Sequence, residues 1–226
     1  MRTTFPYLLP VVIVVAGLII AVALYVVRTG SETYTSLKNI GALLPVTTDD
    51  HILGNPEASV KVITYSDIDC EYCKTFRESM EQLVADESEH GGIAWVYRHY
   101  PQPAQHLYAK KHALASECAY LLGKDTAFFA FVRALNQIAP GGAQFDPAGY
   151  GVVAETLSLP KEELLNCIAG EKTAIRVERD ISNALAIGAD ALPYSVLVVD
   201  GKAPVPISGS LSYQELKAVV DKASER

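Results

Sequence analysis

Two cysteines three residues apart, placed between a strand-like and a helix-like segment, constrain this chain more than any other feature. A strand-like run at residues 60–65 precedes Cys70 and Cys73, and a helix-compatible run follows at 71–85. Side chains at i and i+3 share one face of a helix, so both sulfurs would occupy the first helical turn. Unsatisfied N–H groups and the positive end of the helix dipole would lower the pKa of the first thiol there. We therefore predict a redox-active dithiol, with Cys70 as nucleophile and Cys73 as resolving thiol.

Zinc binding is the main alternative for such a cysteine pair. A structural zinc site needs four ligands, commonly supplied by a second pair of cysteines or histidines at short spacing. The other two cysteines, Cys118 and Cys167, stand far apart, and the five histidines form no pair at such spacing. We therefore expect no metal at the dithiol. We also expect no bound cofactor, because the dithiol itself carries the electrons.

Length and charge bound the remaining choices. The 226 residues, half of them apolar, suit one domain of ordinary size with an appendage. The net charge of −7 argues against a nucleic-acid-binding protein, which should present a basic face. Four cysteines are too few for a scaffold built on disulfides, but an even number is typical of an oxidising compartment.

The appendage is predicted at the start of the chain. Residues 5–27 carry no charge, and about 20 apolar residues span the hydrocarbon core of a bilayer. We expect residues 1–28 to form a transmembrane signal-anchor with a short cytoplasmic end, and 29–50 to form a tether. A cleaved signal peptide is the alternative, with the small residues 21–23 as cleavage site. The apolar run is longer than the apolar h-region of a usual signal peptide and continues past that site, which favours the anchor.

The rest of the chain alternates strand and helix patterns. A glycine pair breaks the chain after the first helix, and the next strand is expected to run parallel to the first. In the last helix, Ser212 and Glu215 have the spacing of a capping box. Further expected elements are a strand at 93–98, a helical pattern at 105–172, a helix at 173–187, a hairpin of strands 195–199 and 205–208, and a helix from about 212. This order indicates a mixed sheet with helices on both faces and one helical insertion.

Several motifs together resemble the DsbA-like thiol–disulfide oxidoreductases of the thioredoxin superfamily. The resemblance covers roughly residues 50–222, and the motifs are His51-Ile-Leu-Gly-Asn-Pro, Tyr65-Ser-Asp67, Cys70-Glu-Tyr-Cys73, Gly188-Ala-Asp-Ala-Leu192-Pro193 and Gly209-Ser-Leu-Ser-Tyr-Gln-Glu-Leu. It implies an α/β, thioredoxin-like domain at 51–226 with a helical insertion at about 104–187, preceded by the transmembrane helix.

The resemblance also assigns substrate-binding residues. In this fold a cis proline faces the dithiol, and the residue before it presents its backbone to the substrate chain. These positions correspond to Pro193 and Leu192, although a trans proline starting the next strand is the plainer alternative. Tyr72, between the cysteines, is expected to be exposed and to touch substrates.

Two departures from the family pattern concern redox tuning. Glu71 stands where a proline commonly follows the first cysteine, and a carboxylate beside a thiolate opposes its ionisation. Asp69 adds negative charge, although it could also cap the helix and leave the dipole effect intact. Thr64 stands where many relatives carry a buried acid that assists proton transfer. These features predict a working dithiol of moderate oxidising power.

Cys118 and Cys167 allow two interpretations. Cys118 follows the apolar spacing of a helix and Cys167 shares a face with Leu164 and Ile168, so both could be small buried hydrophobes. Relatives often have a structural disulfide in this insertion, and the resemblance therefore implies that the two are joined. Closing a loop of this length would contribute about 4 kcal/mol in the chain-entropy model.

The sequence thus predicts a membrane-anchored protein thiol–disulfide oxidoreductase whose catalytic domain lies outside the cytoplasm, on the periplasmic or outer face. Its expected partners are reduced or unfolded exported proteins, and the family pattern adds a membrane redox partner for reoxidation. A reductase or isomerase of the same fold is the nearest alternative. A different class is a chaperone or interaction module in which the bond between Cys70 and Cys73 is only structural.

Overall fold

The computed structural model describes residues 39–88, 92–138, 145–170 and 173–224. The predicted transmembrane segment lies outside these ranges. Among the described residues, no helix has the length and apolar character needed to cross a membrane.

A five-stranded mixed sheet forms the centre of the domain, with strand order β1-β3-β2-β4-β5. Its strands are β1 (His51–Gly54), β2 (Val60–Ser66), β3 (Ala94–His99), β4 (Tyr194–Val199) and β5 (Val205–Ser208). The pair β2 and β3 is parallel, as the sequence predicts, whereas β1–β3, β2–β4 and β4–β5 are antiparallel. The four-residue β1 was not expected from the sequence, which showed only a turn signal at 54–56. It is too short for an alternating pattern and gains its backbone hydrogen bonds from β3.

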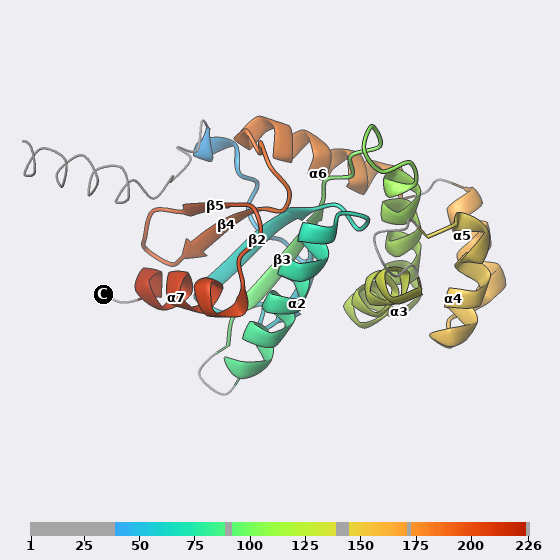
Figure 1. The fold of residues 1–226 in the computed structure, drawn as a ribbon, viewed down its shortest axis with the longest axis horizontal. Helices are drawn as coiled ribbons and strands as arrows, with labels where there is room; N and C mark the ends of the chain where they lie inside the picture. Colours follow the sequence, from blue (N-terminus) through green and yellow to red (C-terminus); the bar gives the residue numbers. More distant parts are fainter. Residues whose placement is uncertain (1–38, 89–91, 139–144, 171–172, 225–226) are drawn as a thin grey trace, which may run out of the picture. The chain divides into compact units, whose positions relative to one another are not determined.

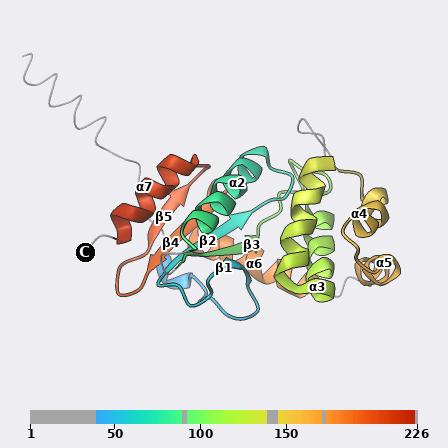
Figure 2. The same ribbon diagram turned by 90° about the horizontal axis from the view of Figure 1, so that it is seen from below.

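Three helices cover the two faces of the sheet. The helices α2 (Glu71–Asp86) and α7 (Tyr213–Ser224) lie on one face, and α6 (Ala174–Ile187) lies on the other (Figures 1 and 2). The capping box of α7 is present, because the Ser212 backbone N–H and hydroxyl both donate to the Glu215 carboxylate, at 2.9 and 2.7 Å. This arrangement confirms the thioredoxin-like α/β fold predicted from the sequence.

The helical insertion lies beside the sheet (Figure 1). It contains α3 (Ala109–Ile138), the short η2 (Pro147–Gly149), α4 (Tyr150–Thr156) and α5 (Lys161–Ala169). The backbone of α3 kinks at Gly123 and Lys124, where the sequence pattern breaks. Helix α6 packs against β3 and therefore belongs to the layer covering the sheet. The insertion predicted at about 104–187 includes α6, which also contacts α3.

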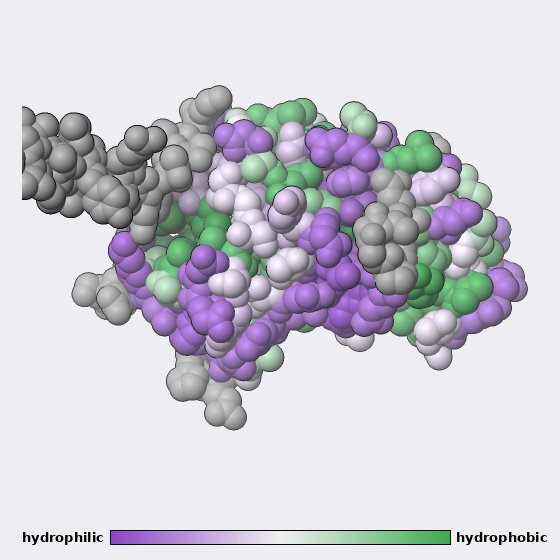
Figure 3. Space-filling view, viewed as in Figure 1, coloured by the Kyte–Doolittle hydropathy of each residue, from purple (hydrophilic) through white to green (hydrophobic). Residues whose placement is uncertain are grey.

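The alternation of side chains along the central strands divides the core in two. On the side of α2 and α7, Val62 and Trp95 join the larger apolar cluster, which continues into the insertion. On the side of α6, Ile63 and Val96 join a smaller cluster. The face seen in Figure 3 carries hydrophobic residues in separate groups among hydrophilic ones.

The described end of the predicted tether is bound to the domain. It includes η1 (Ile40–Ala42), and the buried Arg98 donates to the backbone carbonyls of Leu44 and Pro45, both at 3.1 Å. Arg98 also pairs with Asp50 at 2.9 Å. A buried guanidinium needs acceptors for its five N–H groups, and this segment supplies several of them. The domain therefore begins before residue 51.

Candidate active site

The two cysteines lie where β2 leads into α2. Cys70 is the N-cap residue of α2, and Cys73 lies in the first turn. Cys70 is 8% exposed and Cys73 is 3% exposed, so the nucleophile predicted from the sequence is the more accessible of two buried thiols. No side chain caps this helix. Its first N–H groups are therefore available to a thiolate.

The two thiols differ strongly in acidity. Hydrogen bonding from Cys73 lowers the pKa of Cys70 to about 6, and the backbone N–H groups of Cys73 and Tyr72 act in the same direction against the effect of burial. Burial raises the pKa of Cys73 well above its ordinary value. At neutral pH this combination gives one thiolate at Cys70 and one retained proton at Cys73, as nucleophilic and resolving roles require.

A groove opens beside Cys70. This dithiol groove has a volume of about 220 Å³ and is lined by Cys70, Tyr72, Tyr100, Gln102, Gln105, His106 and residues 189–192. The bond from Leu192 to Pro193 is cis. Leu192 and Tyr72 both line the groove, and Tyr72 is 70% exposed. Two of the three residues predicted to touch substrate, Leu192 and Tyr72, thus lie in one groove with Cys70, and Pro193 is not among the lining residues.

The structure changes the predicted roles of the acidic residues. Glu71 is exposed to solvent, where water and salt screen its charge. Asp69 does not cap α2, because the cap position belongs to Cys70, and its carboxylate instead pairs with the buried His112 at 2.7 Å. Asp67 is the acidic residue that opposes ionisation at the nucleophile. Hydrogen bonding from Cys73 has the strongest effect on the pKa of Cys70 and lowers it, and the negative charge of Asp67 raises it by a smaller amount.

Asp67 and His106 form a pair that the sequence did not reveal. The Asp67 side chain is fully buried, and its Oδ2 atom lies 2.8 Å from Nδ1 of His106. The two residues are 39 positions apart, and His106 lies in the loop between β3 and α3. The sequence interpretation gave the histidines no role, because no local pattern links a loop histidine to a distant carboxylate.

Thr64, the predicted departure from the family pattern, is buried in a cluster of polar groups. The Thr64 hydroxyl is hydrogen-bonded to Ser195 at 2.9 Å and accepts a hydrogen bond from the Trp95 indole at 3.0 Å. Closer to the resolving thiol, hydrogen bonding from Ser66 partly offsets the rise that burial causes in the pKa of Cys73. The Thr64 hydroxyl, which stands in place of the acid expected from the family pattern, therefore has hydrogen-bond partners inside the fold.

Cys118 and Cys167 form a disulfide in the structure, with an S–S distance of 2.04 Å and a Cα–Cα distance of 5.8 Å. The bond joins α3 to α5 and closes a loop of the insertion. It stands apart from the dithiol groove, whose lining includes neither residue.

A second set of buried ionisable groups connects the sheet to the insertion. Potential metal-ligating atoms of His51, His99 and Glu117 lie within 4.8 Å of one another. However, the Arg176 guanidinium donates to the Glu117 carboxylate at 3.0 Å, so a cation already neutralises this carboxylate. Hydrogen bonds from both histidines lower the pKa of Glu117 against the opposing effect of burial. The set is explained as an ion-pair network that links β1, β3, α3 and α6.

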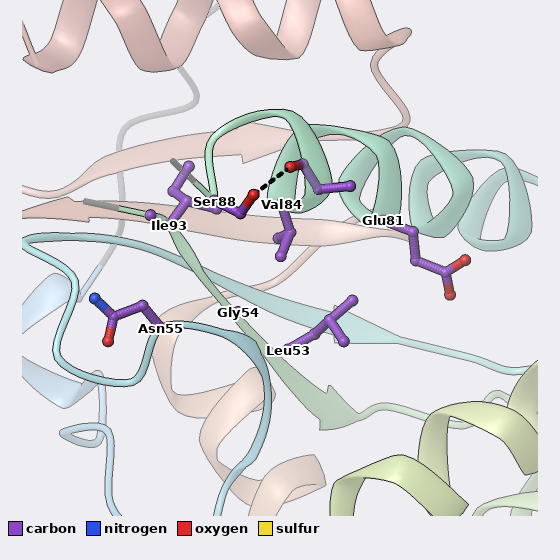
Figure 4. A pocket seen from close by; sticks show the side chains of 9 residues that line it. Leu53, Gly54, Asn55, Glu81, Val84, Ser88 and Ile93 are labelled. Carbon is purple, nitrogen blue, oxygen red and sulfur yellow. Dashed lines mark hydrogen bonds between the residues drawn. The ribbon is translucent and has the colours of Figure 1, made fainter. Parts of the chain in front are cut away.

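Another cavity lies between the end of β1 and α2. It has a volume of about 610 Å³, and its lining includes Leu53, Gly54, Val84 and Ile93 (Figure 4). Gly54 has a φ of +97°, and a Cβ atom there would lie 2.1 Å from the Ile93 carbonyl oxygen, so the position requires glycine. None of the residues predicted from the sequence as site residues lines this cavity.

Comparison with known proteins decides the family. The sequence profile of a family described as thioredoxin matches residues 46–222, most of the chain.

The chain belongs to the thioredoxin family.

Solved structures with the same fold agree with this thioredoxin assignment. The crystal structure of DsbA2 from Pseudomonas aeruginosa has a TM-score of 0.66 at 23% identity, covering 80% of this chain and 96% of that one. Oxidised BdbD from Bacillus subtilis has a TM-score of 0.65 at 19% identity, covering 80% and 95%. The fold implied by the predicted DsbA-like resemblance is confirmed. At 23% and 19% identity, these matches show the shared fold.

A curated relative of this thioredoxin-family chain is a much longer protein. The sodium/proton antiporter NhaA 1 of Salinispora arenicola (strain CNS-205) is 30% identical over 185 residues, or 81% of this chain. The chain spans about a quarter of the length of that relative, since the match covers 26% of it.

Proposed function

We propose that the chain oxidises pairs of thiols in exported proteins through Cys70 and Cys73. Support comes foremost from the unequal acidity of the two cysteines at the start of α2. A Cys70 pKa of about 6 makes this residue a good leaving group when a mixed disulfide is resolved, and stabilises the reduced protein. A purely structural disulfide requires no such asymmetry.

The proposed reaction starts from the Cys70–Cys73 disulfide. A substrate thiolate attacks the sulfur of Cys70, the bond between the cysteines breaks, and its electron pair goes to Cys73, which takes up a proton. A second substrate thiolate then attacks the substrate sulfur in the mixed disulfide and releases Cys70 as a thiolate. The substrate has then lost two electrons and gained a disulfide, and the cysteine pair is reduced.

The dithiol groove is the proposed substrate site. It accommodates an extended segment of a substrate around the reacting sulfur, with Leu192 and Tyr72 offering apolar contacts and Pro193 fixing the loop opposite Cys70. The outer location and the membrane anchor at residues 1–28 belong to this proposal, as does a membrane redox partner that reoxidises the pair. Alkaline extraction of membranes and protease access to the domain in spheroplasts test the anchor and the location.

The reduction potential of Cys70–Cys73, measured by equilibration with glutathione, tests the reaction and its direction. The pKa of Cys70 lies between the values of about 7 for thioredoxin and about 3.5 for DsbA. We therefore expect a potential between those of the two proteins, about −270 and −120 mV. A value below about −300 mV would indicate a structural disulfide and refute the proposal. A value at the lower end of the expected range would favour the reductase.

A substrate assay completes the test. The oxidised protein should form disulfides in a reduced, unfolded protein that contains two cysteines, and Cys70→Ser should abolish this activity because no mixed disulfide can form. Oxidation of the substrate at the same rate by the Cys70→Ser variant would contradict the proposed role of the dithiol.

A further inference from the structure

The dithiol groove contains an ionisable side chain that the reaction described above does not use. His106 lines the groove together with Cys70, and its side chain is 22% exposed. Within the described part of the chain, the ring makes one hydrogen bond, from Nδ1 to Asp67 at 2.8 Å. The second ring nitrogen, Nε2, is therefore not committed to a described protein group.

The hydrogen bonds of Asp67 determine which ring nitrogen carries the proton. Its Oδ1 accepts the Asp69 backbone N–H at 2.9 Å, and its Oδ2 accepts the Gln102 N–H at 2.8 Å. Backbone N–H groups donate to both oxygens of this side chain, and an ionised carboxylate has no proton to donate. Nδ1 of His106 must therefore be the donor in the bond with Asp67. In the neutral ring, Nε2 is then left as a proton acceptor.

This is the arrangement found where a carboxylate orients a histidine that acts as a base for a neighbouring nucleophile. The carboxylate fixes the tautomer and stabilises the imidazolium that forms when Nε2 takes up a proton. Asp67 is held rigidly for this role, because its side chain is fully buried and its own backbone carbonyl accepts the Cys70 N–H at 3.3 Å. One residue thus contacts both the nucleophile and the histidine.

Disulfide exchange creates a need for such a base. The attacking species is the thiolate, and an ordinary substrate cysteine with a pKa of about 8.5 is mostly protonated at neutral pH. Thr64, six residues before Cys70, carries a neutral hydroxyl that is hydrogen-bonded to Ser195 and does not serve as a base. Other ionisable groups that line the groove are Tyr72, Tyr100 and Asp190, and none of them is hydrogen-bonded to Asp67 in the described residues.

We propose that His106, oriented by Asp67, is a catalytic residue that accepts the proton of the substrate thiol as this thiol attacks Cys70. The inference rests on the proposed function and adds a proton acceptor to it. The substrate S–H proton moves to Nε2, the new bond joins the substrate sulfur to Cys70, and the bond between Cys70 and Cys73 breaks. Its electron pair leaves on Cys73, which takes a proton from water. After the second exchange, the imidazolium and the Cys70 thiolate share the groove with opposite charges.

The test follows one turnover of the oxidised protein with a short peptide containing one cysteine, over a range of pH. His106→Gln is expected to be slower by up to about 30-fold near neutral pH, because only about 3% of a thiol with a pKa of about 8.5 is ionised at pH 7. The rate of this variant should follow the fraction of peptide thiolate, with a tenfold rise per pH unit below a pH of about 8.5. The wild type should show a flatter profile, and the two rates should converge above a pH of about 9.

A second variant separates catalysis from positioning. The side-chain amide of His106→Asn can still donate to Asp67, in the place of Nδ1, but it carries no basic nitrogen. If His106 is a base, this variant is as slow as His106→Gln, and added imidazole accelerates His106→Ala. If His106→Asn reacts at the wild-type rate, or if the variants are slower by the same factor at every pH, His106 has a structural role and the inference is overturned.

The two proposals fail in different ways. If the wild-type protein does not react with the peptide at any pH, the proposed oxidoreductase function fails and the inference fails with it. If the wild type reacts and both histidine variants match it near neutral pH, only the role of His106 is refuted.

Discussion

The acidity of Cys70 should depend on the thiol of its partner cysteine. Hydrogen bonding from Cys73 is the strongest cause of the lowered pKa, ahead of burial, which opposes it, and of the backbone N–H groups of α2. A hydrogen bond to a charged group contributes about 1.5–3 kcal/mol. At 1.36 kcal/mol per pKa unit, loss of this bond should raise the pKa of Cys70 by about one to two units. Cys73→Ala should therefore titrate at a pKa of about 7 to 8.

Cys73→Ser is the matched control for this experiment. It replaces one buried donor by another of similar size, so the hydrogen bond to the Cys70 thiolate is retained and the pKa should stay near 6. The ultraviolet absorbance of the thiolate, recorded against pH on reduced protein, measures the pKa in both variants. Circular dichroism at each pH confirms that the fold is unchanged during the titration.

The ionisation of Cys70 should make the stability of the reduced protein depend on pH. A lowered thiol pKa stabilises the charged form, so the reduced wild type should be mostly thiolate at neutral pH and lose this stabilisation as the pH falls through about 6. Equal pKa values in the alanine and serine variants would refute the role of the Cys73 donor. A wild-type pKa above about 8 would refute the assigned acidity altogether.

Three further predictions concern the surroundings of the dithiol. Glu71→Gln should shift the pKa of Cys70 by less than about half a unit, because solvent screens this exposed charge. A shift of a full pKa unit in the same titration would contradict the exposed position of Glu71. Replacing both Cys118 and Cys167 by alanine should lower the free energy of unfolding by about 4 kcal/mol in urea titrations, with the exchange rate of the dithiol unchanged; a parallel loss of exchange would link the insertion to the site. Arg98→Met should lower the free energy of unfolding by about 3–5 kcal/mol in the same assay, because it removes the cation that pairs with the buried Asp50. A decrease below about 1 kcal/mol would show that water compensates the charge of Asp50.

Local sequence patterns predicted much of this fold. The strand, the dithiol and the helix at 60–85 follow each other without interruption, so propensity and spacing were sufficient to place Cys70 and Cys73 at the start of α2. The capping box at Ser212 was also found, because its two partners are three residues apart. Such features depend on neighbours in the chain, whose separation is fixed by the geometry of the helix itself.

Longer-range predictions depended on the family resemblance. The pairing of Cys118 with Cys167 and the position of Leu192 beside Cys70 came from this source, since periodicity shows which side chains are buried and not which ones meet. The transmembrane segment at residues 1–28 remains a prediction, as it lies outside the described residues.

The tertiary structure alone decided the electrostatics of the site. The sequence pointed to Glu71 and Asp69 because they adjoin the cysteines, whereas solvent screens the first and His112 pairs with the second. It could not show that Asp67 pairs with His106, because 39 residues separate them and only folding brings the loop after β3 to the start of α2. Composition and spacing thus determined that this chain carries a reactive dithiol. The packing of distant segments determined which charges and which proton acceptor surround it.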